Sequence, residues 1–188
     1  MVNKVDWSEW YDMTRLQPPN KLLVEALLYV KNTGKVIDIG GGALRDTRHL
    51  LQRGFDVTVI DKNSLLEKEA LKIKNKRLHP IVTSFEDFQF PINEYVLALA
   101  IQSLSYCDFT HFDRVIKNIK LSLKKGGIFC GQIYDEYGQE PKSLHKTYKT
   151  VEEVKEYLKD MEIILFQEEE TEKGRTKHWR IYNFIARK

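Results

Sequence analysis

The stretch that decides the fold of this 188-residue chain is Val36-Ile37-Asp38-Ile39-Gly40-Gly41-Gly42. A short apolar run that leads directly into glycines is typical of a buried strand followed by a tight turn into a helix. Glycine has no Cβ, so the backbone of such a turn can approach a ligand closely. Ligands of open α/β sheets bind at the carboxyl ends of the strands. The sequence therefore predicts a ligand site at this turn.

Two acidic residues indicate the kind of ligand. Asp38 lies two residues before Gly40, where a pyrophosphate-binding loop would not place a carboxylate; a cationic ligand group suits this position. A second predicted strand, residues 56–61, ends at Asp61. An acid at that position accepts hydrogen bonds from ribose hydroxyls. A ribose-containing ligand that carries positive charge fits both observations.

The rest of the chain alternates predicted strands and helices. Strands are predicted at residues 35–39, 56–61, 79–83, 95–101, 128–134, 162–167 and 178–186. The charged segment 168–177 joins the last two strands without a helix, which implies one antiparallel member. Ser64–Glu67 and Thr150–Glu153 have the pattern of capping boxes that open two of the helices. We expect a doubly wound, mostly parallel, seven-stranded α/β sheet with an antiparallel edge strand.

Length and composition predict one domain. The chain is 42% hydrophobic and 30% charged, which is ordinary for a globular protein of this size. We divide residues 1–188 into an N-terminal segment and helix (1–33), a ligand-binding core (34–134) and a C-terminal helix with a strand pair (135–188). Aromatic residues near the start of the chain make the N-terminal segment a candidate lid. These residues are Trp7, Trp10 and Tyr11.

The glycine-rich turn resembles the first motif of class I S-adenosylmethionine (SAM)-dependent methyltransferases, which have a Rossmann-like fold. That motif is an acidic residue, any residue, and then Gly-x-Gly-x-Gly. Asp38, Gly40 and Gly42 match it, whereas Leu44 stands at the third glycine. Leu-Lys-Lys-Gly-Gly at 123–127 is similar to the family's Leu-Lys-Pro-Gly-Gly turn before the fifth strand.

Within that class, the chain is most similar to tellurite-resistance-type (TehB-like) small-molecule methyltransferases. Gly42-x-x-Arg45, Gly54-Phe-Asp-Val57 and Asp61-Lys62-Asn63 carry this likeness. The resemblance implies SAM as the cofactor. The cofactor contacts that it implies come from Asp38, Gly40, Gly41, Gly42, Arg45, Asp61, Lys62, Ser84, Phe85, Ile101 and Gln102. Ser84 occupies a position at which the family usually has an acid. We expect no metal, since the two cysteines lack metal-ligand spacing.

The resemblance implies transfer of a methyl group to an acceptor by in-line displacement, in which the protein mainly aligns the reactants. Nucleic-acid amino-methylating enzymes carry Asp/Asn-Pro-Pro-Tyr after the fourth strand, and this chain has Gln102–Tyr106 there. The net charge of +3 also offers no phosphate-binding track. We therefore expect a small-molecule acceptor and no nucleic-acid partner. The candidate catalytic residues are Tyr106, His145 and His178, with Arg15 and Tyr148 as further acceptor-side candidates.

Two other functions stay open at this point. One is a nicotinamide-dependent oxidoreductase of similar fold, although three residues after Gly42 stands Arg45 rather than glycine. The other is a non-catalytic SAM-binding protein. No run of about 18 apolar residues predicts a membrane span. We expect a cytoplasmic monomer or homodimer.

Overall fold

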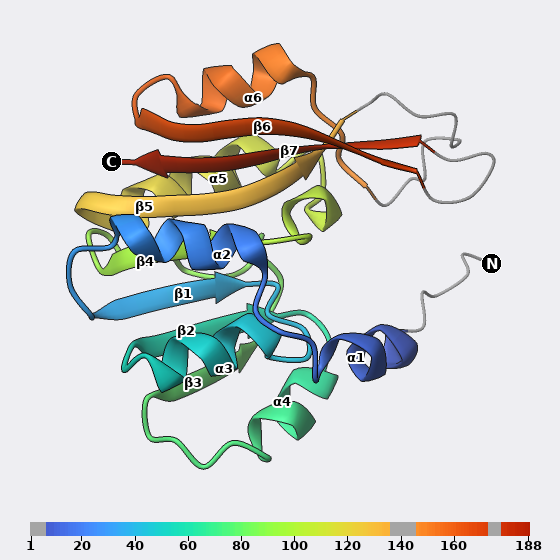
Figure 1. The fold of residues 1–188 in the computed structure, drawn as a ribbon, viewed down its shortest axis with the longest axis vertical. Helices are drawn as coiled ribbons and strands as arrows, with labels where there is room; N and C mark the ends of the chain where they lie inside the picture. The colour runs from blue at the N-terminus through green and yellow to red at the C-terminus, as the bar shows by residue number, and fades with distance from the viewer. Residues whose placement is uncertain (1–6, 136–145, 173–177) are drawn as a thin grey trace.

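The computed structural model describes residues 7–135, 146–172 and 178–188, with the side chains of all of these except 171, 172, 178 and 179. Within them, seven strands form one sheet in the order β3-β2-β1-β4-β5-β7-β6 (Figure 1). The strands are β1 (Lys35–Ile39), β2 (Asp56–Asp61), β3 (Leu78–Val82), β4 (Tyr95–Ala100), β5 (Leu123–Tyr134), β6 (Glu162–Glu172) and β7 (His178–Arg187).

The pairing confirms the doubly wound, mostly parallel sheet with antiparallel pairing at one edge. β1 to β5 pair in parallel, and β7 runs antiparallel to both β5 and β6, which places β6 outermost. The dinucleotide-binding fold has six strands in the order 3-2-1-4-5-6. The reversed β7 between β5 and β6 departs from that order. The chain changes direction between β1 and β4, which makes their carboxyl ends the switch point.

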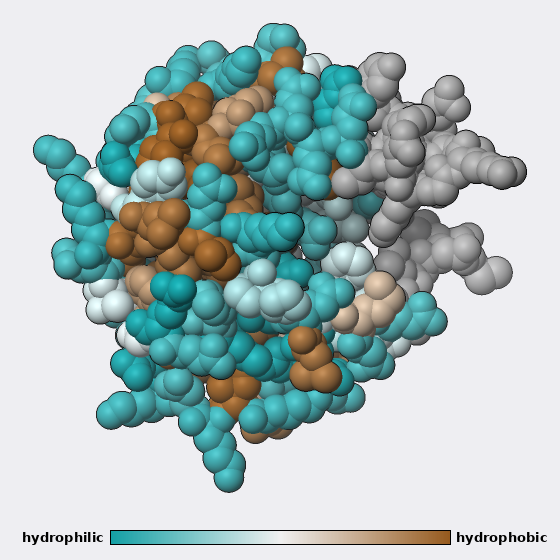
Figure 2. Space-filling view, in the orientation of Figure 1, coloured by the Kyte–Doolittle hydropathy of each residue, from teal (hydrophilic) through white to brown (hydrophobic). Residues whose placement is uncertain are grey.

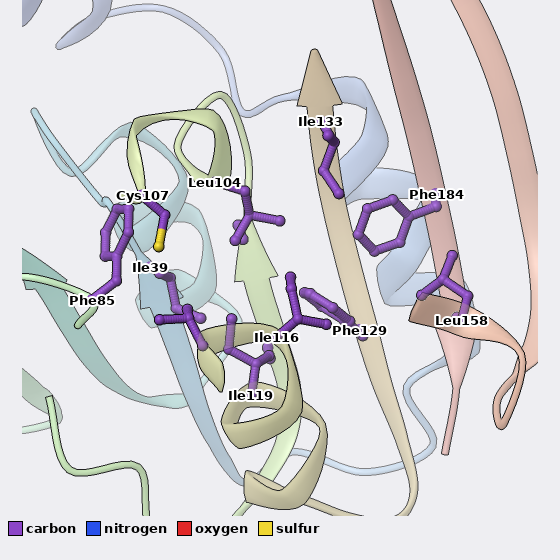
Figure 3. Packing of buried hydrophobic residues seen from close by; sticks show 14 of the residues in the cluster. Ile39, Phe85, Leu104, Cys107, Ile116, Ile119, Phe129, Ile133, Leu158 and Phe184 are labelled. Atoms are coloured by element: carbon purple, nitrogen blue, oxygen red, sulfur yellow. The ribbon is translucent and has the colours of Figure 1, made fainter. Parts of the chain in front are cut away.

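Helices cover both faces of the sheet (Figure 1). The helices are α1 (Ser8–Thr14), α2 (Lys21–Ala26), α3 (Arg45–Gln52), α4 (Leu65–Ala70), α5 (Phe112–Ser122) and α6 (Val151–Leu158), with 3-10 turns η1 (Leu27–Tyr29) and η2 (Leu104–Tyr106). One buried cluster lies under α2 and α3, and a second lies under α5 and α6. Figure 3 shows Ile116 and Ile119 of α5 directed at the sheet beside Phe129 of β5. β1 is buried on both faces because it lies between these clusters.

The two predicted capping boxes had different outcomes. Thr150 and Glu153 form the expected reciprocal box at the start of α6. The box predicted at Ser64 is wrong, because the Ser64 backbone already has helical dihedral angles and its side chain caps nothing. The side chain of Asn63 instead accepts a hydrogen bond from the Leu65 N–H at 3.0 Å. The cap therefore lies one residue earlier than the sequence pattern indicates.

Two segments predicted as connections belong to strands. The 123–127 turn lies inside β5, where Gly126 donates its N–H to the Lys188 carbonyl at 2.7 Å and Gly127 accepts from the Lys188 N–H at 2.9 Å. The final residue thus extends the sheet alongside the glycines. β6 likewise continues through Glu172 into the predicted connection, of which residues 173–177 lie outside the described residues.

The surface of the described residues is mostly hydrophilic in the view of Figure 2, and hydrophobic residues gather there over the C-terminal end of α2. Val24 and Leu28 in this part of the chain are exposed. Among the described residues, no helix has both the length and the apolar character needed to cross a bilayer.

Candidate active site

A pocket lies at the carboxyl ends of β1, β2 and β4, at the switch point of the sheet. Of the residues predicted to contact the cofactor, its lining contains Asp38, Gly40, Gly41, Gly42, Arg45, Asp61, Lys62, Phe85, Ile101 and Gln102. Ser84 is not in the lining. The lining also contains Thr14, Ala43 and Asp46, which the sequence analysis did not name, together with Asn63 and with Ser103 of the segment Gln102–Tyr106. One pocket thus brings together nearly all of the predicted cofactor side.

The glycine-rich turn leaves no room for side chains at its first two glycines. Gly40 has φ +75°, and a Cβ there would lie 2.4 Å from the Cβ of Ser103. A Cβ on Gly41 would lie 2.2 Å from Cγ2 of Val59. The Gly40 N–H donates to the Ile60 carbonyl at 2.8 Å, which fixes the turn against β2. These glycines are required by sterics and not only by turn geometry.

The third-glycine position is occupied by a leucine in a glycine-like conformation. Leu44 has φ +62° and a fully buried side chain that packs with Val59, Leu66 and Ala70. The left-handed backbone costs about 1–2 kcal/mol, and burying a leucine side chain contributes about 1.5–3 kcal/mol. The burial offsets the strain, so the turn keeps its shape despite the departure from the motif.

Asp61 ends β2 with its carboxylate held by the backbone. Oδ2 accepts the Gly42 N–H at 3.0 Å, and Oδ1 accepts the Asn63 N–H at 2.9 Å. Burial raises the pKa of Asp61, and these two backbone hydrogen bonds oppose that shift. A carboxylate has about four lone-pair sites, so two remain for ligand hydroxyls. The ribose-binding role that the sequence predicts for this acid stays a prediction, and these free lone pairs are what it requires.

Asp38 is a buried acid in the middle of the sheet, with only 4% of its surface exposed. The Thr47 hydroxyl donates to its Oδ2 at 2.6 Å. Burial raises the pKa of Asp38 to about 7, the charge of Asp46 adds to the shift, and the Thr47 hydrogen bond opposes it. Arg45 does not neutralise Asp38 directly, because its guanidinium binds both carboxylate oxygens of Asp46. A cationic ligand group near Asp38 would stabilise its ionised form.

Two buried hydroxyls in the pocket have no hydrogen-bond partner within the part of the chain that the structure describes. They are Tyr11 Oη and Ser103 Oγ. An unsatisfied buried polar group costs about 1–3 kcal/mol. Such groups in a pocket lining are suited to a polar ligand.

The N-terminal aromatic residues form one wall of the pocket, on α1 beyond the carboxyl ends of β1 and β2 (Figure 1). Trp7, Trp10 and Tyr11 all line it. The ring of Trp7 meets Tyr106 edge to face, with centroids 5.2 Å apart. Burial raises the pKa of Tyr106, and the nearby Tyr148 adds to that shift. Residues 1–6 of the predicted lid segment lie outside the described residues, and the part from Trp7 onward lines the pocket; its role as a lid stays a prediction.

The remaining predicted residues lie elsewhere. Ser84 is half-buried, and its hydroxyl donates to Asp87 Oδ2 at 2.7 Å. Arg15 is not in the pocket lining, and its guanidinium binds Glu69. His145 lies outside the described residues, and His178 begins β7 with its side chain outside them. Tyr106 is therefore the predicted catalytic candidate that the structure places in the pocket.

A family model described as tellurite resistance protein TehB matches residues 2–182. The chain belongs to the TehB family. Solved structures similar to this TehB-family chain include TehB from Haemophilus influenzae, with TM-score 0.76 and 21% identity over 97% of this chain and 65% of that one. A second is 1,6-didemethyltoxoflavin-N1-methyltransferase from Burkholderia thailandensis, with TM-score 0.73 and 18% identity over 96% of this chain and 81% of that one.

Among curated proteins, the TehB-family chain is similar to the uncharacterized protein YmfD of Escherichia coli (strain K12). The two are 30% identical over 121 residues, which cover 58% of this chain and 54% of YmfD. The chain thus spans about half the length of that relative. The family match and the structural neighbours confirm the predicted likeness to TehB-type class I methyltransferases and their fold.

The pocket of this TehB-family chain fits SAM as its cofactor. Asp61 offers free carboxylate lone pairs for ribose hydroxyls, and Asp38 offers a buried negative charge for a cationic group. Phe85 and Ile101 supply apolar walls for an adenine ring. The unpartnered hydroxyl of Tyr11 is a further polar group for the ligand.

Proposed function

We propose that the protein transfers a methyl group from SAM to a small-molecule acceptor by in-line displacement. The observation that carries the proposal is the meeting of Asp61 with the glycine-rich turn, at a Gly42 N–H to Asp61 Oδ2 distance of 3.0 Å, in a pocket that also contains the buried Asp38. When bound, SAM supplies a methyl group on a sulfonium that is already activated for transfer.

On the cofactor side, the chain's own residues bind and orient. Asp61 receives the ribose hydroxyls, and Asp38 attracts the positive end of the cofactor. The bare backbone of Gly40–Gly42 lets the cofactor lie against the turn. These contacts fix the direction along which the acceptor must approach, and alignment of this kind supplies much of the rate enhancement in such reactions.

On the acceptor side, the chain closes the pocket. Trp7 and Trp10 exclude water, and Tyr106 forms the wall at the exit of β4. The +3 net charge of the chain and the enclosure by α1 favour a small acceptor over a nucleic acid. His145 and His178 remain candidates for a proton-transfer role on the strength of the sequence alone.

Ligand titration followed by turnover tests this function. We expect S-adenosylhomocysteine and SAM to raise the melting temperature, because a ligand that binds only the folded state stabilises it. NADH and NADPH serve as controls for the oxidoreductase alternative. Incorporation of labelled methyl is then measured with thiols, amines, chalcogen oxyanions and RNA. A melting shift with a dinucleotide alone, or transfer to RNA but to no small acceptor, would contradict the proposal; cofactor binding without any transfer would favour a non-catalytic protein.

A further inference from the structure

A cluster of charged side chains lies beside the cofactor pocket, centred on Glu69 of α4. The Glu69 side chain is 4% exposed, and the guanidinium of Arg15 binds both of its oxygens, at 2.9 Å through Nε and 2.7 Å through Nη2. Lys72 donates to Glu69 Oε1 at 2.7 Å, and Arg48 approaches Oε2 at 3.4 Å. Charge-assisted, bidentate pairs between arginine and a carboxylate are among the stronger polar contacts in proteins.

Arg15 directly follows α1, so its ion pair joins the pocket's aromatic wall to α4. Arg48 of α3 strengthens the same junction, because its Nη1 donates to the Arg15 carbonyl at 3.2 Å and to the Ala43 carbonyl at 2.6 Å. Ala43 belongs to the pocket lining. Helices α1, α3 and α4 therefore meet at one buried carboxylate. Burial alone would raise the pKa of Glu69, but the hydrogen bonds from Arg15 and Lys72 outweigh it and hold the pKa below its usual value.

Besides this ion pair, α1 meets the domain along the pocket wall, where the ring of Trp7 just before the helix lies edge to face with Tyr106 at 5.2 Å. The buried residues of α1 are Tyr11 and Thr14, and both line the cofactor pocket. Met13 is 61% exposed, and Leu16 just after the helix is 91% exposed, so neither anchors it. Tyr11 is already buried, at 3% exposed, so the apolar anchor of α1 is part of the pocket wall itself. The ion pair of Arg15 with Glu69 adds a polar attachment directly after the helix.

We propose that Glu69 is a positioning residue that holds α1 against the cofactor pocket through its ion pair with Arg15, and thereby slows release of the nucleoside. The proposal about release rests on the proposed function, whereas the attachment of α1 does not. Glu69 acts through Arg15 and does not touch the ligand. Loss of the ion pair lets α1 open more often, and a pocket wall that opens more often releases its ligand faster.

Two substitutions and one control separate this role from a general loss of stability. Arg15→Gln is the safer variant, because Lys72 and Arg48 still compensate the charge of Glu69. Glu69→Gln removes the other partner of the ion pair. Asp12→Asn is the matched control: Asp12 also contacts Arg15, at 3.0 Å, but it is 72% exposed, and exposed pairs contribute little.

Hydrogen exchange without ligand measures the attachment of α1. The Tyr11 N–H donates to the Trp7 carbonyl and the Arg15 N–H to the Tyr11 carbonyl, both at 3.0 Å. We expect these amides to exchange about tenfold faster in both Arg15→Gln and Glu69→Gln. This factor corresponds to the loss of about one charge-assisted hydrogen bond. Amides of α5 should exchange as in the unmodified protein, as should α1 in Asp12→Asn. Unchanged α1 exchange in both variants would overturn the proposal.

Stopped-flow tryptophan fluorescence measures release, since Trp7 and Trp10 line the pocket. S-adenosylhomocysteine is the probe. We expect its dissociation to be about tenfold faster in Arg15→Gln and Glu69→Gln and unchanged in Asp12→Asn. Equal dissociation rates in all variants would overturn the link to release. If the unmodified protein does not bind S-adenosylhomocysteine, the proposed function fails, and the exchange of α1 without ligand still decides whether Glu69 holds the helix.

Discussion

The two sides of the pocket are built in different ways. The cofactor side is fixed by hydrogen bonds from backbone N–H groups: Gly40 donates to the Ile60 carbonyl of β2, and the Asp61 carboxylate accepts from Gly42 and Asn63. The opposite wall consists of side chains on or directly before the short helix α1, which the ion pair of Arg15 with Glu69 ties to α4 just after its end. The first side can fix a ligand, and the second can open to admit one. Substitutions on the two sides should therefore differ in size and in kind.

The largest effect is expected at Gly40. Gly40→Ala adds a Cβ that would lie 2.4 Å from Ser103, in a backbone with φ +75°. We expect SAM affinity to fall by more than about a hundredfold and stability to fall by about 1–3 kcal/mol from overpacking. Calorimetric titration and thermal unfolding measure the two effects.

Gly126→Ala is the matched control for Gly40→Ala. Gly126 has nearly the same φ, +78°, but no atom lies within 4 Å of its added Cβ. We expect Gly126→Ala to lower the free energy of unfolding by about 1–2 kcal/mol, which is the cost of the left-handed backbone alone. Its SAM affinity should be unchanged. Equal affinity losses in the two variants would mean that the turn at Gly40 is not a ligand contact.

A smaller loss of SAM affinity is expected when Asp61 is replaced. Asp61→Ala removes a carboxylate that we place on the ribose hydroxyls, and hydrogen bonds to charged groups contribute about 1.5–3 kcal/mol. SAM affinity should fall by about ten- to a hundredfold, as measured by calorimetry. Asp56→Ala at the other end of β2 is the control, because its carboxylate contacts the exposed His79. If Asp61→Ala binds SAM as tightly as Asp56→Ala does, Asp61 does not contribute to the site.

Most residues of the cofactor side could be predicted from the sequence, because the sequence patterns that indicate them are local. An apolar run, a glycine cluster and an acid at the end of the next strand depend on neighbours in the chain, and the parallel sheet then brings Asp38 and Asp61 to one edge. Ser84 was predicted to contact the cofactor because its position in the sequence matches a family position. That match does not show which way the side chain points, and the Ser84 hydroxyl binds Asp87 instead.

The contacts that the sequence did not reveal are tertiary. Glu69 looks like one more charge on an exposed helix, and only the fold shows that Arg15, 54 residues earlier, reaches it. Ser103 became part of the site because Gly40 packs against it. The cap at Asn63 replaced the one predicted at Ser64 because Asn63 is itself fixed by Asp61. Sequence patterns do not carry such long-range or competing contacts.

A third effect depends on pH and again belongs to the cofactor side. Burial raises the pKa of Asp38 to about 7 from 3.8, so the folded protein holds a proton between these values that the unfolded chain has lost. The resulting stability is fully present below pH about 4 and is lost as pH rises through about 7. A cationic ligand prefers the ionised form, so SAM affinity should rise about fivefold from pH 6 to pH 7, by about a further twofold up to pH 8, and then level off.

Calorimetric titration from pH 5.5 to 8.5 measures this profile. Asp38→Asn should bind SAM more weakly at pH 8 and should lose most of the pH dependence. Asp46 and Arg45, which form their own ion pair, also face Asp38. A pH profile that persists unchanged in Asp38→Asn would assign the titration to another group.

The smallest effect is expected on the acceptor side, at Tyr106. Burial raises the pKa of its hydroxyl, so the phenol stays protonated at neutral pH and is a poor base. Tyr106→Phe keeps the ring that meets Trp7 at 5.2 Å and removes the hydroxyl alone. We therefore expect kcat to change by less than about threefold, whereas loss of a true acid–base group costs about 10²–10⁴-fold. Tyr106→Ala removes the aromatic contact as well, about 0.5–1.5 kcal/mol, and should lower kcat further by loosening the wall. A drop of a hundredfold or more in Tyr106→Phe, with unchanged affinity for S-adenosylhomocysteine, would instead make Tyr106 a catalytic residue and would show that the acceptor side does more than enclose the reactants.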